Sequence, residues 1–327
     1  MAAQYTQPIR NLRQQSGLTL IEIMVSMAIG LFLILGAVTV YTQGRASFQV
    51  TEGTSRIQEN LRFAFDVMEP DVRMAGFWGM HNDPNNFLTG TVTITCDGSD
   101  VSDWAMDHYV GLTARDNVLS ADAGNVAANA RKAATCGAFA DGIKPGTDIL
   151  EVRHAGGDPV ALKPGTVQVQ SERAKSHLMS NGVKPADYSA LVDESATFDY
   201  VFNTYYVSAE SQSFEAVPSL RRRTLVGTTV VDEEIIAGVE NLQVQLGIDA
   251  NGDGGVDRYI DPEDDAFNAD SSIIAVRLWL LMRAEYAETG LVDKRTYEAP
   301  DGTTSEPNDG FRRLKGSKTI FLRNSRS

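Results

Sequence analysis

The stretch "GLTLIEIMVSMAIGLFLILGAVTVY", residues 17–41, decides the fold of this 327-residue chain. Residues 23–44 carry no formal charge, and Glu22 is the acidic residue that stands at the start of the run. As an α-helix, the apolar segment 18–42 is long enough to cross a hydrocarbon layer of ~30 Å. The sequence therefore predicts a membrane-spanning helix that carries a carboxylate near its N-terminal end.

The residues before this helix are polar and basic, and they contain no apolar run of their own. A secretory signal peptide has its apolar region before the cleavage site, whereas here the apolar run follows Gly17. Arg10 and Arg13 precede the run and are expected to hold the N-terminus in the cytoplasm. We therefore expect a single-pass protein of the inner membrane with its body in the periplasm.

The order of these features resembles the signature of type IV prepilins. A short basic leader ends at Gly17, Glu22 follows five residues later, and an apolar helix continues from there. The resemblance implies that the prepilin peptidase cleaves between Gly17 and Leu18 and that the new N-terminus of Leu18 is methylated. The sequence departs from the usual pattern at Leu18, where phenylalanine is commonest, and this bears on methylation more than on cleavage.

Glu22 has a physical reason to be where it is. A charge inside a membrane is costly unless it is paired, so a subunit gains by packing beside a group that neutralises it. After cleavage the freed α-amino group of Leu18, on the same or a neighbouring subunit, is the expected partner. The resemblance implies that this carboxylate sets the register of subunits joining a filament. The alternative is an interfacial glutamate whose side chain only reaches water.

Apolar residues continue at helical spacing beyond the membrane segment. They recur every three or four residues and predict one buried stripe on the helix. Pro70 is expected to kink or end this helix. The stripe comprises Ile57, Leu61, Ala64 or Phe65, Met68, Val72 and Ala75.

The second half of the chain reads as strands separated by turns. An amphipathic helix followed by such strands predicts an α+β fold, in which a mainly antiparallel β-sheet packs on the long helix. A further short strand is expected at residues 91–95, and one short helix at 121–134. The predicted strands of the second half are 148–153, 166–170, 199–207, 224–231, 242–248, 272–282 and 317–323.

Several segments narrow the resemblance to PilW-type minor pilins. "EIIAGVENLQVQLGID", residues 234–249, and "SIIAVRLWLLMRAE", residues 272–285, are similar to a pair of strands in that family. "DVRMAGFWG" after the long helix and "FLRN" at residues 321–324 fit the same pattern. Thr39 lies where many major pilins carry a helix-breaking proline, which favours a minor subunit.

The resemblance gives the domain organisation. Residues 1–17 form a leader peptide that is cleaved, and residues 18–42 form the transmembrane or filament-core helix. Residues 43–76 form the amphipathic half of the same helix, and residues 77–327 form a globular β-rich pilin domain.

The composition argues against other classes of function. A formal net charge of −14 repels phosphate backbones, so a general nucleic-acid-binding role is excluded. The four histidines are scattered, and the sequence has no nucleophile elbow and no phosphate-binding loop. We therefore expect no enzymatic activity and no small-molecule substrate. The basic run at residues 221–223 is interpreted as a solvated strand end, with an interaction patch as the alternative.

Two cysteines, Cys96 and Cys136, follow the membrane segment. In an exported body, two thiols favour one disulfide bond. The alternative is a pair of small core residues that are not linked.

The loop "DANGDGGVD", residues 249–257, is the strongest candidate for a metal site. Acidic and amide side chains alternate in it, as in the oxygen-rich shells that Ca²⁺ prefers. Ile260 occupies the twelfth position, where an EF-hand needs glutamate, so a helix–loop–helix motif is not expected. The alternative is a hairpin turn, because Asn-Gly and Asp-Gly are typical of tight turns. The candidate calcium ligands are Asp249, Asn251, Asp253, Gly255 and Asp257.

Together these features predict a minor pilin of a type IV pilus, in the tip or priming complex that initiates assembly. The filament would support adhesion, twitching motility or DNA uptake. The expected partners are other minor pilins, the major pilin, a pilus-tip adhesin and the prepilin peptidase, and the mature protein is expected in the pilus at the cell surface. The alternatives are a minor pseudopilin of type II secretion and an anchored binding protein that never polymerises.

Overall fold

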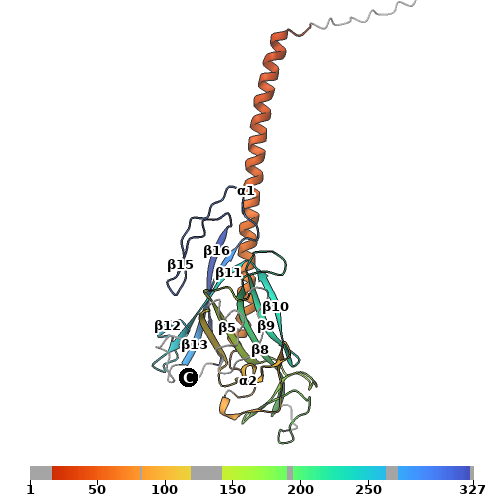
Figure 1. Cartoon of the computed structure of the whole chain (residues 1–327), viewed down its shortest axis with the longest axis vertical. Helices are drawn as coiled ribbons and strands as arrows, with labels where there is room; N and C mark the ends of the chain where they lie inside the picture. The colour runs from red at the N-terminus through yellow and green to blue at the C-terminus, as the bar shows by residue number, and fades with distance from the viewer. Residues whose placement is uncertain (1–16, 82, 119–141, 190–193, 263–271, 325–327) are drawn as a thin grey trace, which may run out of the picture. The chain divides into compact units, whose positions relative to one another are not determined.

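The computed structural model describes residues 17–81, 83–118, 142–189, 194–262 and 272–324. It divides into two compact units, residues 1–52 and residues 53–327. The helix predicted at residues 121–134 lies outside the described residues. Figure 1 shows the order of the elements along the chain.

The helix α1 (Leu20–Met74) contributes to both units. Within the first unit its large apolar side chains are exposed, from Leu20 at 77% to Phe48 at 68%. Among the described helices, α1 is the one long and apolar enough to cross a membrane. It continues through Pro70 to Met74, so Pro70 does not end it.

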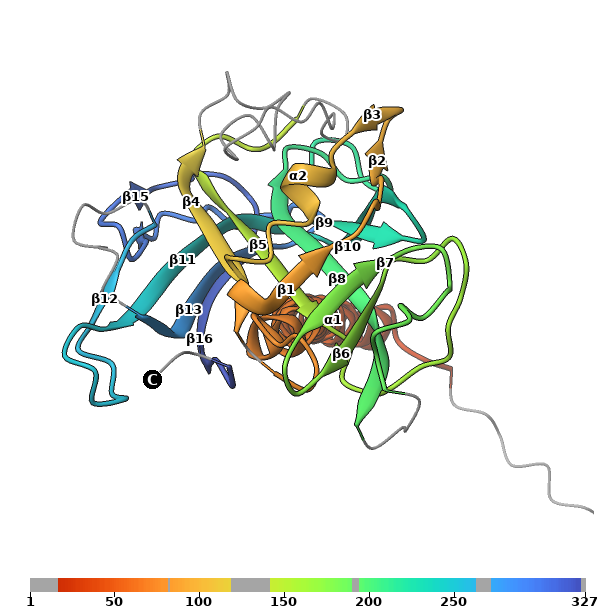
Figure 2. The same cartoon turned by 90° about the horizontal axis from the view of Figure 1, so that it is seen from below.

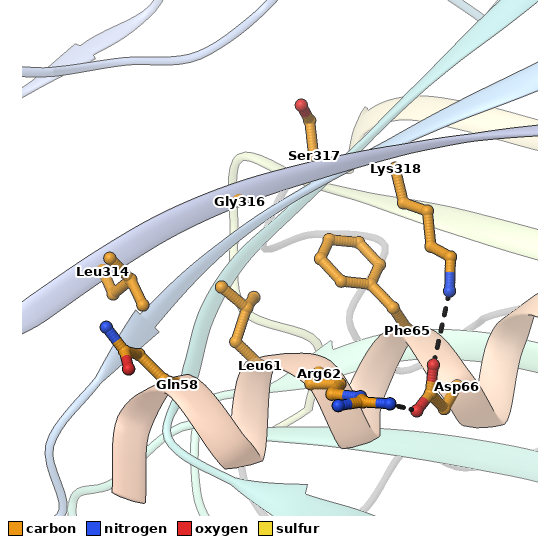
Figure 3. A pocket seen from close by; sticks show the side chains of 9 residues that line it. All are labelled: Gln58, Leu61, Arg62, Phe65, Asp66, Leu314, Gly316, Ser317 and Lys318. Carbon is orange, nitrogen blue, oxygen red and sulfur yellow. Dashed lines mark hydrogen bonds and ion pairs between the residues drawn. The ribbon is translucent and has the colours of Figure 1, made fainter. Parts of the chain in front are cut away.

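In the second unit the predicted stripe of α1 is confirmed. One face of the helix enters the main core, and Gly316 of β16 allows the closest approach, since a Cβ there would lie 2.7 Å from Leu61 Cδ2. Figure 3 shows Leu61 and Phe65 pointing toward this strand. The buried residues of the stripe are Ile57, Leu61, Ala64, Phe65, Met68 and Val72 in the helix and Ala75 directly after it.

The largest sheet among the described residues has ten strands, in the order β1-β7-β6-β8-β9-β10-β2-β3, with β5 on β8 and β4 on β5. All its pairs are antiparallel except β1–β7 and β10–β2. The strands are β1 (Phe87–Thr89), β2 (Thr95–Cys96), β3 (Ser99–Asp100), β4 (Leu112–Val118), β5 (Thr147–Ala155), β6 (Gln168–Glu172), β7 (Ser176–Met179), β8 (Ser195–Ser208), β9 (Ser219–Val226) and β10 (Thr229–Ala237).

A second sheet has the order β12-β11-β13-β16 and is antiparallel throughout. Its strands are β11 (Val239–Asp249), β12 (Arg258–Ile260), β13 (Ser272–Arg283) and β16 (Arg313–Phe321), and β14 (Tyr297–Glu298) pairs with β15 (Thr304–Ser305) in a small separate hairpin. Two short helical turns complete the fold, η1 (Pro84–Asn86) and α2 (Ser102–Ala105).

The main core joins α1 to both larger sheets. It contains Leu150 and Tyr205 from the first sheet and Leu246, Val276 and Ile320 from the second. Figure 2, which looks along α1, shows the strands of the second unit arranged beside the helix. The α+β prediction is confirmed: a long N-terminal helix packs on mainly antiparallel sheets.

Most predicted strands are present, and the two predicted as a pair do pair. β11 and β13 run antiparallel, with Leu246 opposite Val276. Two predictions are wrong in detail. Residues 224–231 are not one strand, because Gly227, with a φ of +65°, begins the turn between β9 and β10. Of residues 91–95, only Thr95 is in a strand.

The basic run in β9 is not a solvated strand end. Arg221 is fully buried and Arg223 is 1% exposed. The β9–β10 register places the three arginines opposite three acids, with Arg221 Nε 2.6 Å from Asp232 Oδ1. The complementary acidic run Asp232–Glu234 lies one turn further along the chain, and this was the sequence signal for the pairing.

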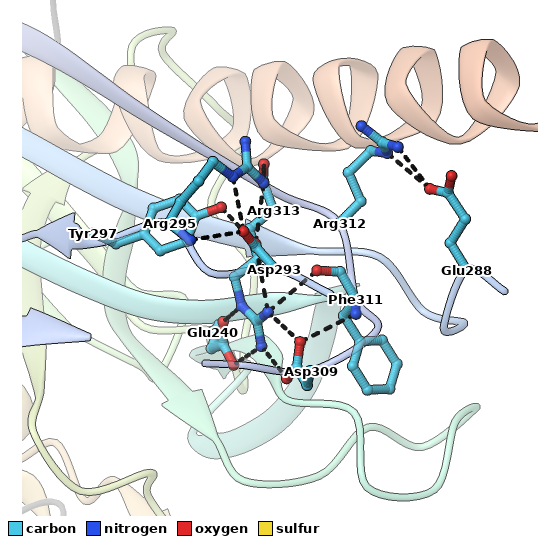
Figure 4. A network of polar contacts seen from close by, with 9 residues as sticks. All are labelled: Glu240, Glu288, Asp293, Arg295, Tyr297, Asp309, Phe311, Arg312 and Arg313. Carbon is cyan, nitrogen blue, oxygen red and sulfur yellow. Dashed lines mark hydrogen bonds and ion pairs between the residues drawn. The ribbon is translucent and has the colours of Figure 1, made fainter. Parts of the chain in front are cut away.

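Arg313 lies at the centre of a buried ionic network that attaches the segment after β13 to β11 (Figure 4). Its guanidinium donates to both carboxylate oxygens of Asp309, at 2.6 and 2.7 Å, and to Glu240 Oε1 at 3.1 Å. Nearby, hydrogen bonds from Arg295 hold the pKa of Asp293 down to about 2. Because this folded-state pKa lies below the ordinary value, the stability that Asp293 contributes is present above pH ~4 and is lost as the pH falls through about 2.

Replacing Arg313 by methionine is expected to lower the free energy of unfolding by about 2–3 kcal/mol, because it leaves the half-buried carboxylates of Glu240 and Asp309 without their partner. The matched control is Lys315→Met on the same strand, where the side chain is exposed and the change should stay within about 0.5 kcal/mol. The measurement is denaturant unfolding of the full chain in detergent. Equal effects for both variants would show that the network contributes little to stability.

Candidate functional site

Glu22 closes a reciprocal cap at the start of α1. Thr19 precedes the first helical residue, and both its backbone N–H and its hydroxyl donate to Glu22 Oε2, at 2.9 and 2.8 Å. In return the backbone N–H of Glu22 donates to Thr19 Oγ1 at 3.3 Å. This capping box satisfies donors that the first helical turn leaves open. It also holds the carboxylate at the positive end of the helix dipole.

The predicted cleavage position lies outside the helix. Leu18 is 76% exposed, and a Cβ placed on Gly17 would have no atom within 4 Å. An exposed, non-helical peptide bond is the kind of site that a protease can reach. The structure therefore brings Gly17, Leu18 and Glu22 together at one end of α1.

The polar side chains further along the apolar segment bond to their own helix. Ser26 Oγ donates to the carbonyl of Glu22 at 2.7 Å, and Thr39 Oγ1 donates to that of Leu35 at 2.8 Å. Since residues 23–44 contain no acidic or basic residue, Glu22 is the carboxylate that has to be neutralised when this segment is buried.

The cap itself was not predicted from the sequence. The expected partner of Glu22 was the freed amine, whereas the structure gives the carboxylate two donors from Thr19. The available signal was threonine three residues before glutamate, immediately ahead of an apolar run, which is the pattern of a capping box.

The loop between β11 and β12 is held by its own acidic side chains. Asp249, which is 2% exposed, accepts the backbone N–H groups of Gly252 at 2.7 Å and Gly254 at 2.8 Å. These hydrogen bonds, chiefly that of Gly254, hold the pKa of Asp249 below its usual range. Asp257 Oδ2 accepts from Ala250 at 2.7 Å in the same way. The loop thus forms a turn between β11 and β12 that its own acidic side chains hold together.

Two of the predicted ligands, Asn251 and Asp253, form hydrogen bonds that hold the middle of the loop. Asp253 Oδ1 accepts the backbone N–H of Gly255 at 2.8 Å, and Asp253 N–H donates to Asn251 Oδ1 at 2.9 Å. No group of three metal-ligating side chains suited to an ion is found within the described residues, and the acids at 263–265 lie outside them. Calcium binding by this loop stays a prediction.

Titration of the full chain in detergent with Ca²⁺ is expected to give a binding heat that Asp253→Ala abolishes. Mg²⁺ should give a weaker signal, because it resists dehydration and demands octahedral geometry. Isothermal calorimetry is the measurement, and the absence of heat with Ca²⁺ would leave the loop as a turn only.

Of the two cysteines in the predicted disulfide, the structure describes only Cys96. Cys96 is 5% exposed and packs in the second apolar cluster with Trp78 and Trp104. Cys136 lies outside the described residues, so its pairing with Cys96 stays a prediction.

Comparison with known families decides what kind of protein this is. Residues 12–38, which include the cap and the cleavage position, match the prokaryotic N-terminal methylation motif. Residues 204–324, from the middle of β8 to the end of β16, match type IV pilus-assembly protein W. The chain is thus similar to the PilW family of type IV pilus-assembly proteins over residues 204–324 and carries the N-terminal methylation motif.

The PilW match covers both strands that suggested the family from sequence. PilW proteins are pilin-like structural proteins and not enzymes, so the expectation of no enzymatic activity is confirmed at the level of the family. The methylation motif implies processing by the prepilin peptidase and agrees with anchoring in the inner membrane before incorporation into a pilus.

The other comparisons add less. A search of curated protein sequences found no match to this chain. A type IV-like pilin from Thermus thermophilus is a structural match with 12% identity and a TM-score of 0.35, covering 82% of this chain and 97% of that one. A likeness of this size supports no inference about function.

Proposed function

We propose that this protein is a minor pilin in the tip or priming complex that initiates type IV pilus assembly. The observation that carries the proposal is the exposed apolar surface of α1 up to Phe48, with one carboxylate capped at its N-terminal end. Such a surface is unstable in water and needs lipid or other helices around it. The helix would stay in the inner membrane until it packs among the helices of a filament.

Glu22 gives this packing its selectivity. When the helix leaves the bilayer for the filament core, the carboxylate has to find a positive charge. The freed α-amino group of a neighbouring Leu18 supplies it at one axial position. The expected neighbours are other minor pilins, the major pilin and a pilus-tip adhesin.

The unbroken course of the helix also favours the assignment as a minor pilin over that as a major pilin. It is unbroken at Thr39, whose hydroxyl bonds the carbonyl of Leu35, at the position where many major pilins carry a proline.

A deletion strain tests the proposed role. Loss of the gene is expected to remove surface pili while type II exoprotein secretion continues, and an epitope-tagged copy should be found at pilus tips by immunogold labelling. Pili in normal numbers would contradict a priming role.

The same deletion strain distinguishes the proposed role from a second candidate function, that of a minor pseudopilin of type II secretion. That protein would share the signature and the long helix, but its deletion would stop exoprotein secretion and spare the pili. A third candidate, an anchored protein that never polymerises, predicts that residues 1–17 remain on the membrane-extracted chain.

A further inference from the structure

The second unit contains an open groove of about 450 Å³ between α1 and β16 (Figure 3). Leu61 and Phe65 of the helix and Leu314 of the strand give it an apolar lining. At its polar side Arg62 and Lys318 both pair with Asp66, at 3.5 and 3.3 Å. The groove thus combines apolar contact area with a rim of paired charges.

One wall of the groove is an open strand edge. Within the described residues, β16 pairs with β13 on one side and with no strand on the other. The bonds from Leu322 N–H to Ile274 O and from Ala284 N–H to Arg312 O show which residues face β13. In an antiparallel pair such bonds come from every second residue, so the even-numbered residues of β16 bond to β13.

The odd-numbered residues of β16 therefore direct their backbone N–H and C=O groups away from the sheet. An exposed row of such groups is a template for an added strand. At the far end Phe321 is 62% exposed and offers an apolar contact next to the edge. The residues whose backbone groups face outward are Lys315, Ser317, Thr319 and Phe321.

The charged side chains of this strand segment have one sign. Residues 311–324 contain basic side chains and no acid, in a chain whose net charge is −14. Arg313 is occupied by its network, and Arg312 pairs with Glu288 at 2.7 Å. Lys318 pairs with Asp66 and Glu69 of α1. Lys315 is exposed, and the described residues give it no ion pair. A segment with acidic side chains is the complement of this edge.

We propose that an extended acidic segment of a neighbouring pilus subunit adds as a strand to the open edge of β16, with its apolar side chains in the groove beside α1. That the partner is a pilus subunit rests on the proposed function. The β16 edge of a second copy does not fit, because two basic edges repel each other.

The first test uses a fluorescein-labelled nine-residue peptide that alternates glutamate with valine, matching the length of β16. Fluorescence anisotropy with the full chain in detergent is expected to show binding that a lysine–valine peptide lacks. A second acidic peptide, N-methylated at every other residue, keeps the charge but cannot form a ladder on one edge, and it should bind at least about tenfold more weakly.

Two variants of the protein separate backbone pairing from charge. Thr319→Pro removes an outward N–H without removing a bond to β13, and it is expected to weaken binding of the acidic peptide about tenfold or more. Thr319→Ala keeps the N–H and should bind as the native chain does. Lys315→Glu keeps the edge but reverses one charge, and it should weaken binding of the acidic peptide and strengthen binding of the basic one.

Equal binding of the native acidic and N-methylated peptides would overturn the proposal, and so would unchanged binding by both Thr319→Pro and Lys315→Glu. In cells, a photo-cross-linking residue at Thr319 is expected to capture an acidic extended segment of another pilus subunit. The control position is Gln212, an exposed residue in the loop between β8 and β9, where no such capture is expected. Capture of another copy's β16, or of no subunit, would contradict the proposal. Peptide binding does not require filaments, so its failure is distinct from the failure of the deletion test.

Discussion

Replacing Gly17 by valine is expected to leave residues 1–17 on the protein and to lower its content in filaments more than tenfold. The new side chain has open space around it, since a Cβ at Gly17 meets no atom within 4 Å. The substitution should therefore leave the fold intact and act on recognition by the peptidase. Without cleavage, Leu18 has no free α-amino group, and the carboxylate of Glu22 loses its proposed partner.

Intact-mass measurement of the membrane-extracted chain checks this result directly. A matched control is Thr39→Val, which changes an exposed helix position downstream of the cleavage site and should be processed normally. Complete cleavage of Gly17→Val at the same bond would contradict the assignment of this glycine to the processing site.

Replacing Glu22 by glutamine is expected to abolish incorporation into filaments while the helix still forms. The amide oxygen of glutamine can accept the same hydrogen bonds from Thr19, so the cap is retained. The amide has no charge, so it gains nothing from a neighbouring α-amino group. The variant thus removes the pairing that is proposed to select the axial position, and little else.

Thr19→Ala is the matched control for Glu22→Gln. It removes the hydroxyl of the cap, a loss worth about 1 kcal/mol for helix N-caps, but it keeps the charge of Glu22. If Glu22 acts in capping alone, Thr19→Ala should lower incorporation into filaments more than Glu22→Gln does. If Glu22 acts in charge pairing, Glu22→Gln should lower incorporation more.

The sequence was most informative where its pattern is local. The apolar run that begins at residue 18 and the stripe from Ile57 to Val72 follow the helical pattern, and the structure has almost all of these residues in one helix. The strands at residues 242–248 and 272–282 were likewise predicted, and the resemblance implied that they pair. Such signals depend on neighbours along the chain, which the sequence shows directly.

The features that depend on distant residues were harder to predict. Arg313 is buried with Glu240 and Asp309 as partners from other segments, and no local sequence pattern indicates these partners. The open edge of β16 depends on the strand order of a whole sheet. The pairing of Arg221–Arg223 with the acids of β10 could have been predicted from the sequence, because only a short hairpin separates the two runs.

The candidate site shows the same division. Gly17 and Glu22 were identified from their spacing before an apolar helix. The cap formed by Thr19 had a visible signal, whereas the groove beside α1 had none, because its two walls come from residues 58–66 and 314–318.

The most direct test of the account is the amount of this chain in sheared filaments from strains that express native protein, Glu22→Gln or Thr19→Ala at equal membrane levels. Charge pairing at the N-terminus of α1 predicts that the glutamine variant is absent from filaments and that the alanine variant is retained. Native amounts of Glu22→Gln in the filaments would contradict the account.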